Sequence, residues 1–339
     1  MPISPIERNN YAEPNAEAFI FGFDFNPDGA IDKVDWSTVK PTAACPTSGW
    51  RWLHFNRLAA ETRDWLENSS DLDETVISAL LQSETRPRCA AYEDGVLLNL
   101  RGINLNPGAE PEDMISVRIW ATRNIVISMR SYPVKAVHEV REDVTSGALE
   151  NLSPGGLVVA LADKLIDKIE PVVEQLKEEA DEFEEQLLTS KENLPAIPLA
   201  EFRSTILILR RYILPQRDAM VQLQREGRQL LVADQGLHLR EAADRITRIS
   251  EELDSIRDRA AVLQDQLAGQ RQEQLNRRLL TLSIISAFFL PLTFFTGLLG
   301  MNLAGIPYQD QDWSFGAVVG ATAVISIGLL GLLKWRRWI

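Results

Sequence analysis

Residues 291–302 read PLTFFTGLLGMN and close the first of two apolar segments near the C-terminus. The two segments are Leu279–Leu299 and Phe315–Leu333, and a short polar loop joins them. At about 1.5 Å per residue each helix would be roughly 30 Å long, which matches the hydrocarbon thickness of a bilayer. The sequence therefore predicts a membrane hairpin of two transmembrane helices.

The distribution of charge around this hairpin predicts its orientation. The connecting loop carries only Asp310 and Asp312, whereas the basic residues lie at the other ends of the segments: Arg277, Arg278, Lys334, Arg336 and Arg337. Positive charge flanks the cytoplasmic ends of membrane helices, so we expect both termini in the cytoplasm and the loop outside the bacterial inner membrane. The N-terminal region lacks the pattern of a signal peptide, so we expect the hairpin to direct insertion.

The overall charge restricts the partners of the rest of the chain. The net charge is -13, and residues 278–339 contribute +2 from four basic and two acidic residues, which leaves -15 on the remainder. Such a body repels nucleic acid and attracts cations, which excludes a nucleic-acid-binding role. Cys45 and Cys89 form no C-x-x-C motif, and a reducing cytoplasm favours two free thiols.

The N-terminal region mixes strand and helix signals. Large apolar residues occupy every second position in 115–119 and in 125–129, on either side of Thr122-Arg123-Asn124, which predicts a β-hairpin. A further strand is expected at Gly95–Arg101, and helices are expected at Asn56–Asn68, Asp73–Gln82 and from Pro133 into Glu142. These elements predict an α+β domain that ends near Gly147.

The following region has the pattern of long helices. They are expected at Pro154–Leu188, at Leu199–Arg228 and from Asp234 onward. The third has a narrow apolar seam with steps of three and four: Leu239, Ile246, Ile249, Leu253, Ile256, Ala260, Leu263 and Leu267. No proline lies between Ala233 and Leu290, so one helix of about 65 residues, on the order of 100 Å long, is expected to enter the membrane.

Two features of this stalk have alternative interpretations. A seam of this kind is equally compatible with a plain anchor or signalling stalk. The acidic run at residues 178–185 is interpreted as a solvated helix face in preference to a cation-concentrating site. The predicted organisation is a cytoplasmic α+β domain (1–150), a long-helix cytoplasmic stalk (151–278), a first span (279–299), a periplasmic loop (300–314), a second span (315–334) and a basic cytoplasmic tail (335–339).

One face of the first span is unusual for a helix exposed to lipid. Small and hydroxyl residues recur along it in steps of three and four: Ser283, Ser286, Leu290, Thr293, Gly297 and Gly300. Such a face permits either close helix packing or a narrow polar path for ions. Leu279 and Leu282 lie nearer the cytoplasm and are candidates for an apolar constriction.

Residues 291–302 also resemble the signature of the CorA-type divalent cation transporters, whose Gly-Met-Asn motif corresponds to Gly300, Met301 and Asn302. The position of the motif, at the outer end of a penultimate span, makes the resemblance specific. It implies a homopentamer with a cytoplasmic funnel, in which five copies of the first span surround one central pore. The pore-facing positions that it implies are Asn302, Gly297, Thr293, Leu290, Leu282 and Leu279.

The loop after the motif points to one branch of this family. Residues 303–308 read LAGIPY and resemble the Gly-Gly-x-Pro loop of the ZntB zinc transporters, although Ala304 replaces the first glycine. The magnesium branch instead continues with an acidic Met-Pro-Glu loop. The resemblance thus implies transport of Zn²⁺, with a Mg²⁺ or Co²⁺ channel as the alternative.

The residues of the spans limit how an ion could cross. Neither span contains His, Cys, Asp or Glu, so Zn²⁺ would lack its usual ligands and is expected to keep much of its water. Asp310 and Asp312 are expected to attract cations at the mouth of the pore. No cofactor is expected, and His138 with Glu142 is a weak candidate for a metal site, whereas His54 is expected to be packed in the domain.

Two other classes of function, a membrane-anchored sensor and an enzyme, fit the sequence less well than transport. A membrane-anchored sensor would need an output motif such as that of a kinase or cyclase, and none is present. An enzyme is disfavoured because no cluster of nucleophile, base and orienting residue emerges, and the sequence has no P-loop consensus for ATP.

Overall fold

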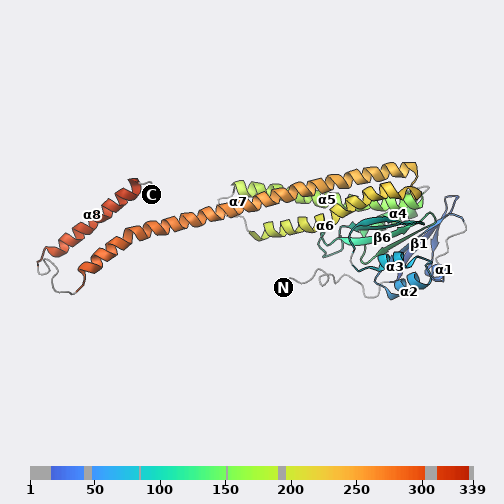
Figure 1. Cartoon of the computed structure of the whole chain (residues 1–339), viewed down its shortest axis with the longest axis horizontal. Coiled ribbons are helices and arrows are strands. Elements are labelled where there is room, and N and C mark those ends of the chain that lie inside the picture. The colour runs from blue at the N-terminus through green and yellow to red at the C-terminus, as the bar shows by residue number, and fades with distance from the viewer. Residues whose placement is uncertain are drawn as a thin grey trace. The chain divides into compact units, whose positions relative to one another are not determined.

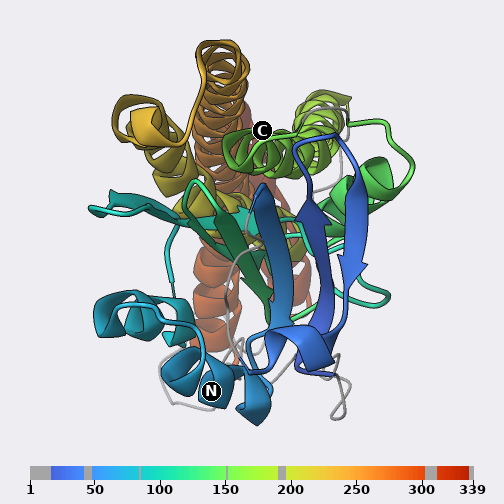
Figure 2. The same cartoon turned by 90° about the vertical axis from the view of Figure 1, so that its right-hand side faces the viewer.

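The computed structural model describes residues 17–41, 48–83, 85–149, 152–189, 196–301 and 311–335. Its N-terminal part contains a seven-stranded mixed sheet in the order β2-β1-β3-β7-β6-β5-β4, in which only β3 and β7 are parallel (Figures 1 and 2). The strands are β1 (Phe19–Phe25), β2 (Ile31–Val34), β3 (Trp50–Asn56), β4 (Arg88–Ala91), β5 (Val96–Gly102), β6 (Ile115–Ala121) and β7 (Ile125–Arg130). The expected α+β class is confirmed, as are the strand β5 and the hairpin of β6 and β7.

The strands β1, β2, β3 and β4 were not predicted. All seven residues of β3 are buried, so the strand lacks the alternation that reveals a half-exposed strand. Its one arginine, Arg51, is held by both carboxylate oxygens of Asp24 on β1, at 2.6 and 2.8 Å. β1 carries a phenylalanine at every second position, a period-two signal that could have identified it.

The helices of this part cover both sides of the sheet (Figure 2). α2 (Ala60–Asn68) and α3 (Glu74–Leu81) lie on one side, while α4 (Lys135–Thr145), α5 (Pro154–Thr189) and α6 (Ala196–Glu226) lie on the other. A short helix, α1 (Trp36–Val39), precedes β3. The helix expected from Asn56 begins at Ala60, because β3 continues through Asn56. α3 begins as expected, with Asp73 accepting a hydrogen bond from the Thr75 amide at 2.8 Å.

The long helices confirm the predicted change of pattern after the sheet. α6 is followed by a short 3₁₀ turn, η2 (Gly227–Gln229), and by α7 (Ala233–Leu299), which is one continuous helix of 67 residues. Every member of the predicted apolar seam, from Leu239 to Leu267, is buried. The narrow seam therefore serves as the packing face of the N-terminal half of α7, as its periodicity predicts.

Ion pairs join α7 to its two neighbours. Arg245 reaches three carboxylates of α5, those of Asp163 at 2.5 Å, Asp167 at 2.6 Å and Glu170 at 2.9 Å. Farther along, Arg259 pairs with Asp181 and Glu184, and Arg210 of α6 pairs with Asp254. The acidic run at residues 178–185 is thus only partly a solvated face, because two of its carboxylates are used to bind α7.

The chain divides into two compact units, and α7 belongs to both. The first contains the sheet, α1 to α6 and α7 as far as Leu263, and the second contains α7 from Gln264 and α8 (Ser314–Trp335). The end of α7 and α8 are long and apolar enough to cross a membrane. Of the residues described at 279–299 and in α8, only Leu333 is buried within a single chain, which is the reverse of what is found for a soluble core.

The buried Cys89 on β4 gives a test of the domain core. Burial, with a smaller contribution from the charge of Glu226, raises the pKa of its thiol to about 12. In a Cys45→Ser background we expect maleimide to modify folded protein at least about 100-fold more slowly than unfolded protein at neutral pH, because little thiolate is present. Mass spectrometry measures the rate of maleimide modification, and the Cys89→Ser variant gives the background. Equal rates in folded and unfolded protein would contradict the burial of Cys89.

Candidate functional site

The strongest candidate site is one face of α7 between Leu279 and Gly300. At about 100° per residue, the positions of this face fall within an arc of about 100°. We call it the hydroxyl face, and its members are Leu279, Leu282, Ser283, Ser286, Leu290, Thr293, Gly297 and Gly300. The helix is unbroken to Leu299, so the positions that the sequence proposes for a pore lie along one line of one rigid element.

The large apolar members of the hydroxyl face have no cover within the chain. Leu279 is 60% exposed, Leu282 is 59% exposed and Leu290 is 71% exposed. Gly297 has open space around the position where a Cβ would lie. A contiguous exposed apolar surface of this kind is typical of contact with lipid or with other copies of a chain.

Two hydroxyl groups of this span donate their protons within the helix. Ser283 donates to the Leu279 carbonyl at 2.8 Å, and Thr296 donates to the Leu292 carbonyl at 3.0 Å. Each hydroxyl oxygen therefore retains free lone pairs, which can accept hydrogen bonds from water. Pro291 cannot donate to the carbonyl one turn earlier, so that carbonyl is also available as an acceptor. The span offers oxygen acceptors without any charged side chain.

The motif begins at the C-terminal end of α7. The Gly300 amide donates to the Thr296 carbonyl at 2.9 Å, which completes the last turn, and Met301 follows with its side chain exposed. Asn302, the loop at residues 303–308 and Asp310 lie outside the described residues, as do the basic Arg336 and Arg337. Asp312, the other acidic residue of the loop, is described and exposed.

The histidines differ in their surroundings. His54 is buried, as expected, with its Nδ1 at 2.8 Å from the Ser128 hydroxyl. His138 is exposed and lies 3.3 Å from a Glu142 carboxylate oxygen one helical turn later. The structure thus brings together the two weak metal candidates, but among the described residues no group of three or more His, Cys, Asp or Glu is arranged to hold a metal.

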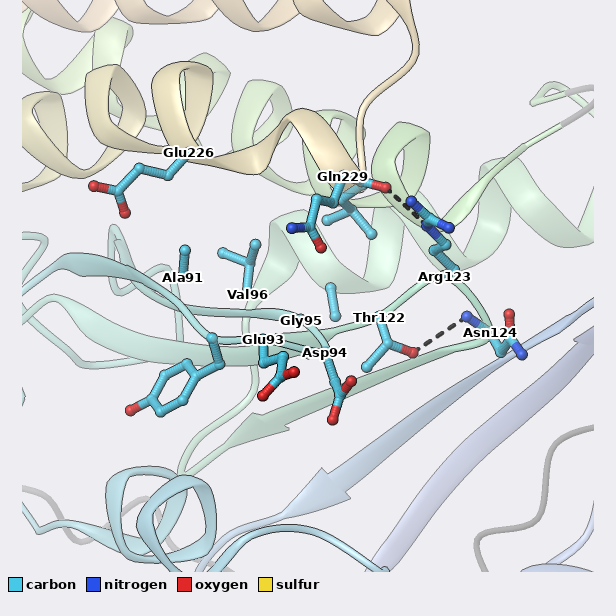
Figure 3. A pocket seen from close by; sticks show the side chains of 13 residues that line it. Ala91, Glu93, Asp94, Gly95, Val96, Thr122, Arg123, Asn124, Glu226 and Gln229 are labelled. Carbon is cyan, nitrogen blue, oxygen red and sulfur yellow. Dashed lines mark hydrogen bonds between the residues drawn. The ribbon is translucent and has the colours of Figure 1, made fainter.

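A cavity of about 440 Å³ lies between the β4–β5 turn and the end of α6 (Figure 3). Glu93 and Asp94 come from the turn and point away from Glu226 on the helix, so the three carboxylates do not converge. Arg123 closes one end by donating to the Gln229 carbonyl at 3.3 Å. Sequence reasoning missed this cavity because its lining comes from three distant segments, and its carboxylates are too dispersed for a metal centre.

Comparisons with known proteins agree with this arrangement. The family described as "CorA-like Mg2+ transporter protein" matches residues 47–335. The divalent cation transporter CmaX of Pseudomonas aeruginosa is 35% identical over 96% of this chain and 99% of its own length. The zinc transport protein ZntB of Yersinia enterocolitica is 32% identical over 89% of this chain and 92% of its own length.

Solved structures extend the likeness to the whole fold. The full-length CmaX structure superposes with a TM-score of 0.79 at 34% identity, covering 96% of this chain and all of that one. The complete CorA magnesium transporter of Methanocaldococcus jannaschii gives a TM-score of 0.78 over 96% of this chain and 99% of its own, although only 15% of residues are identical, so this match speaks for the fold alone. The sheet domain, the long helices, the two apolar helices and the motif after the first of them together place the chain in one family: it belongs to the CorA-like transporter proteins.

Proposed function

We propose that this protein carries divalent metal cations, with Zn²⁺ as its physiological ion, across the bacterial inner membrane through a central pore. The observation that supports this most directly is the hydroxyl face of α7. It is continuous, uncharged and uncovered in a single chain, and it ends at Gly300-Met301. Copies of the chain that meet along this face would enclose a narrow path lined by oxygen acceptors.

The assembly proposed is a homopentamer with five copies of α7 around one axis. The exposure of Leu279, Leu282 and Leu290 supports it, because these leucines need either lipid or neighbouring copies to cover them. In such a ring Leu279 and Leu282 would form an apolar constriction that closes by excluding water. Ser283, Ser286, Thr293 and Gly297 would then line the wider part of the path.

The proposed ion crosses with most of its water retained. A bare Zn²⁺ binds nitrogen, sulfur or carboxylate ligands, and neither span supplies them. Hydroxyl oxygens, backbone carbonyls and the Asn302 amide oxygens can instead accept hydrogen bonds from the hydration shell. Asp310 and Asp312, repeated in each copy, would raise the local concentration of cations at the outer mouth.

The choice of zinc over magnesium rests on the loop and on the relatives. Residues 303–308 resemble the loop of the ZntB branch, and a protein named as a zinc transporter is 32% identical over most of its length. The alternative is a Mg²⁺ or Co²⁺ channel, which the complete Gly300-Met301-Asn302 motif favours. Both termini are proposed to lie in the cytoplasm, because the basic residues flank the two ends of the hairpin that lie opposite its loop.

Any coupling to protons is proposed to use groups outside the spans. Neither span carries a side chain that titrates near neutral pH, so a proton relay through the membrane has no carrier there. Carboxylates of the loop or of the N-terminal unit are the groups that could titrate during transport.

Metal uptake into proteoliposomes tests this function. With purified protein we expect Zn²⁺ uptake that persists in an excess of Mg²⁺, measured with a zinc-sensitive dye trapped inside, and protein-free vesicles give the background. The same vesicles with and without an imposed pH gradient measure proton coupling. Uptake of Mg²⁺ that excess Zn²⁺ does not reduce would support the alternative, and the absence of uptake of either metal would reject transport by this chain.

A further inference from the structure

A small basic pocket lies at the start of α4, within the first compact unit. Its volume is about 280 Å³, and its polar lining includes Arg130, Lys135, His138 and Arg141, with His54 at its base. The described residues that line it include no Asp or Glu. Such a concentration of positive charge is unexpected in a chain with 48 acidic and 35 basic residues.

The cations of this pocket lack the partners that other basic residues of the chain have. Of the ion pairs found between described residues, none includes Arg130, Lys135 or Arg141. By contrast, the single residue Arg245 takes part in three of them. The Arg141 guanidinium lies 5.1 Å above the Phe21 ring, which fixes its direction without neutralising it. Burial lowers the pKa of the Arg130 guanidinium, and no carboxylate offsets this effect. A partly buried, unpaired cation is costly unless an anion joins it.

His54 adds a buried, unpartnered ring nitrogen to the same pocket. Its ring is stacked on Phe21, with the centroids 4.8 Å apart, and its Nε2 is buried without a hydrogen-bond partner. Burial and the charges of Arg130 and Arg141 lower the pKa of His54 well below its usual value, so the ring is neutral. Its Nδ1 is 2.8 Å from the Ser128 hydroxyl, which also accepts a hydrogen bond from the Trp52 indole at 2.8 Å. The Ser128 hydroxyl donates to the Leu53 carbonyl at 3.3 Å, so Nδ1 of the neutral ring donates to Ser128 and the buried Nε2 is left as an acceptor.

The backbone at the entrance of α4 contributes further donors. Val134 is the N-cap residue and has no side chain that could accept a hydrogen bond from the first turn. The amides of Lys135 and Ala136 have no acceptor within the helix, because the first turn of any α-helix leaves its N–H groups unpaired. The helix dipole adds partial positive charge at this end. Unpaired amides beside basic side chains form a ready-made site for an oxyanion.

We propose that this pocket binds a phosphate group, with Arg130, Arg141 and Lys135 neutralising it, the α4 amides donating to its oxygens, and His54 Nε2 accepting a hydrogen bond from its P–OH group. The lining favours an oxyanion over a halide, because it combines two guanidinium groups, one ammonium group and a helix N-terminus, which suit a ligand with several acceptor oxygens. Either free phosphate or the phosphate of a small metabolite supplies this chemistry. The site is separate from the hydroxyl face, so its test does not depend on the identity of the transported ion.

Calorimetric titration of the full chain in nanodiscs tests the proposal. We expect inorganic phosphate to bind with at least about tenfold higher affinity than chloride. A parallel titration with a nucleoside monophosphate separates the two sources, since tighter binding than that of free phosphate indicates a metabolite and weaker binding indicates the free ion. Undetectable phosphate binding, or equal affinity for chloride, would overturn the proposal.

Matched substitutions locate the binding. Arg141→Gln and Lys135→Gln remove exposed or half-exposed charges and should each weaken phosphate binding by about tenfold, because a charge-assisted hydrogen bond contributes about 1.5–3 kcal/mol. Arg63→Gln makes the same charge change on α2, outside the pocket, and should leave the affinity unchanged. Equal effects of all three substitutions would mean a general charge effect and would overturn the site.

A spectroscopic measurement tests whether the His54 ring contacts the bound phosphate. The chain has three histidines, so ¹⁵N-histidine labelling of the full chain gives a simple solid-state NMR spectrum. Phosphate should shift the Nε2 resonance of His54, assigned through His54→Asn, and leave that of His238 unchanged. A spectrum in which phosphate does not move the His54 resonance would overturn the assignment of this side chain to the site.

Discussion

Replacing Asn302 by alanine is expected to abolish selective divalent uptake while the protein still assembles. In the proposed pore the Asn302 amide oxygens accept hydrogen bonds from the water shell of the ion. A hydrogen bond to a charged or strongly polarised group contributes about 1.5–3 kcal/mol, so we expect at least about a tenfold loss of discrimination between divalent and monovalent cations. Competitive uptake into proteoliposomes, with K⁺ against Zn²⁺ and Mg²⁺, measures this loss.

A matched control for this experiment lies on α7 itself. Asn276→Ala makes the same chemical change just before the first apolar segment, where Asn276 accepts a hydrogen bond from Gln272 at 3.3 Å. We expect this variant to transport like the unsubstituted protein, and gel filtration should give both variants the same oligomer. If Asn302→Ala retains full selectivity, the motif is not the filter and the proposed pore is wrong.

The second large effect is expected from Arg245→Glu, which should destabilise the first compact unit. Arg245 holds three carboxylates of α5 at 2.5 to 2.9 Å, and the substitution would place a fourth carboxylate among them. These carboxylates are partly exposed, so water and salt screen the repulsion, and we expect a loss of about 2 kcal/mol in the free energy of unfolding. Thermal unfolding followed by circular dichroism measures the change.

The pH dependence of this variant gives a second measurement. Burial raises the pKa of Asp163, and the charge of Arg245 opposes that effect. Without Arg245 the acidic cluster should take up protons more readily, so acidification toward pH of about 5 removes repulsion and should narrow the stability difference. Arg240→Glu, an equal charge change at an exposed position of α7, should cost little at any pH. A similar loss in both variants would show that net charge, and not the ion-pair cluster, is responsible.

The helical half of the molecule could be predicted closely because its signals are local. The seam from Leu239 to Leu267 repeats with the period of a helix, and each of its members is buried. The absence of proline from Ala233 to Leu290 predicted one unbroken helix, which is found as α7. The two apolar segments are set by length and composition, which do not depend on distant contacts.

The sheet could be predicted only in part, since one of its interior strands, β3, has no local signature. β3 is buried on both faces, and its polar residues Arg51 and His54 find their partners, Asp24 and Ser128, on neighbouring strands. A sequence pattern cannot reveal such pairing, because the residues that satisfy each other are separated by tens of positions. For the same reason the cluster of three carboxylates around Arg245 has no signature in the sequence.

The sequence by itself determined the membrane hairpin, the long helix and the hydroxyl face, because hydrophobicity, helical period and chain length are properties of consecutive residues. Only the tertiary structure decided which charges are paired and which are not. It showed that part of the acidic run binds α7, and that Arg130 and Arg141 form no ion pair with any described carboxylate and lie in the pocket of the buried His54. Burial and charge pairing depend on neighbours in space, and folding brings those neighbours together from opposite ends of a domain.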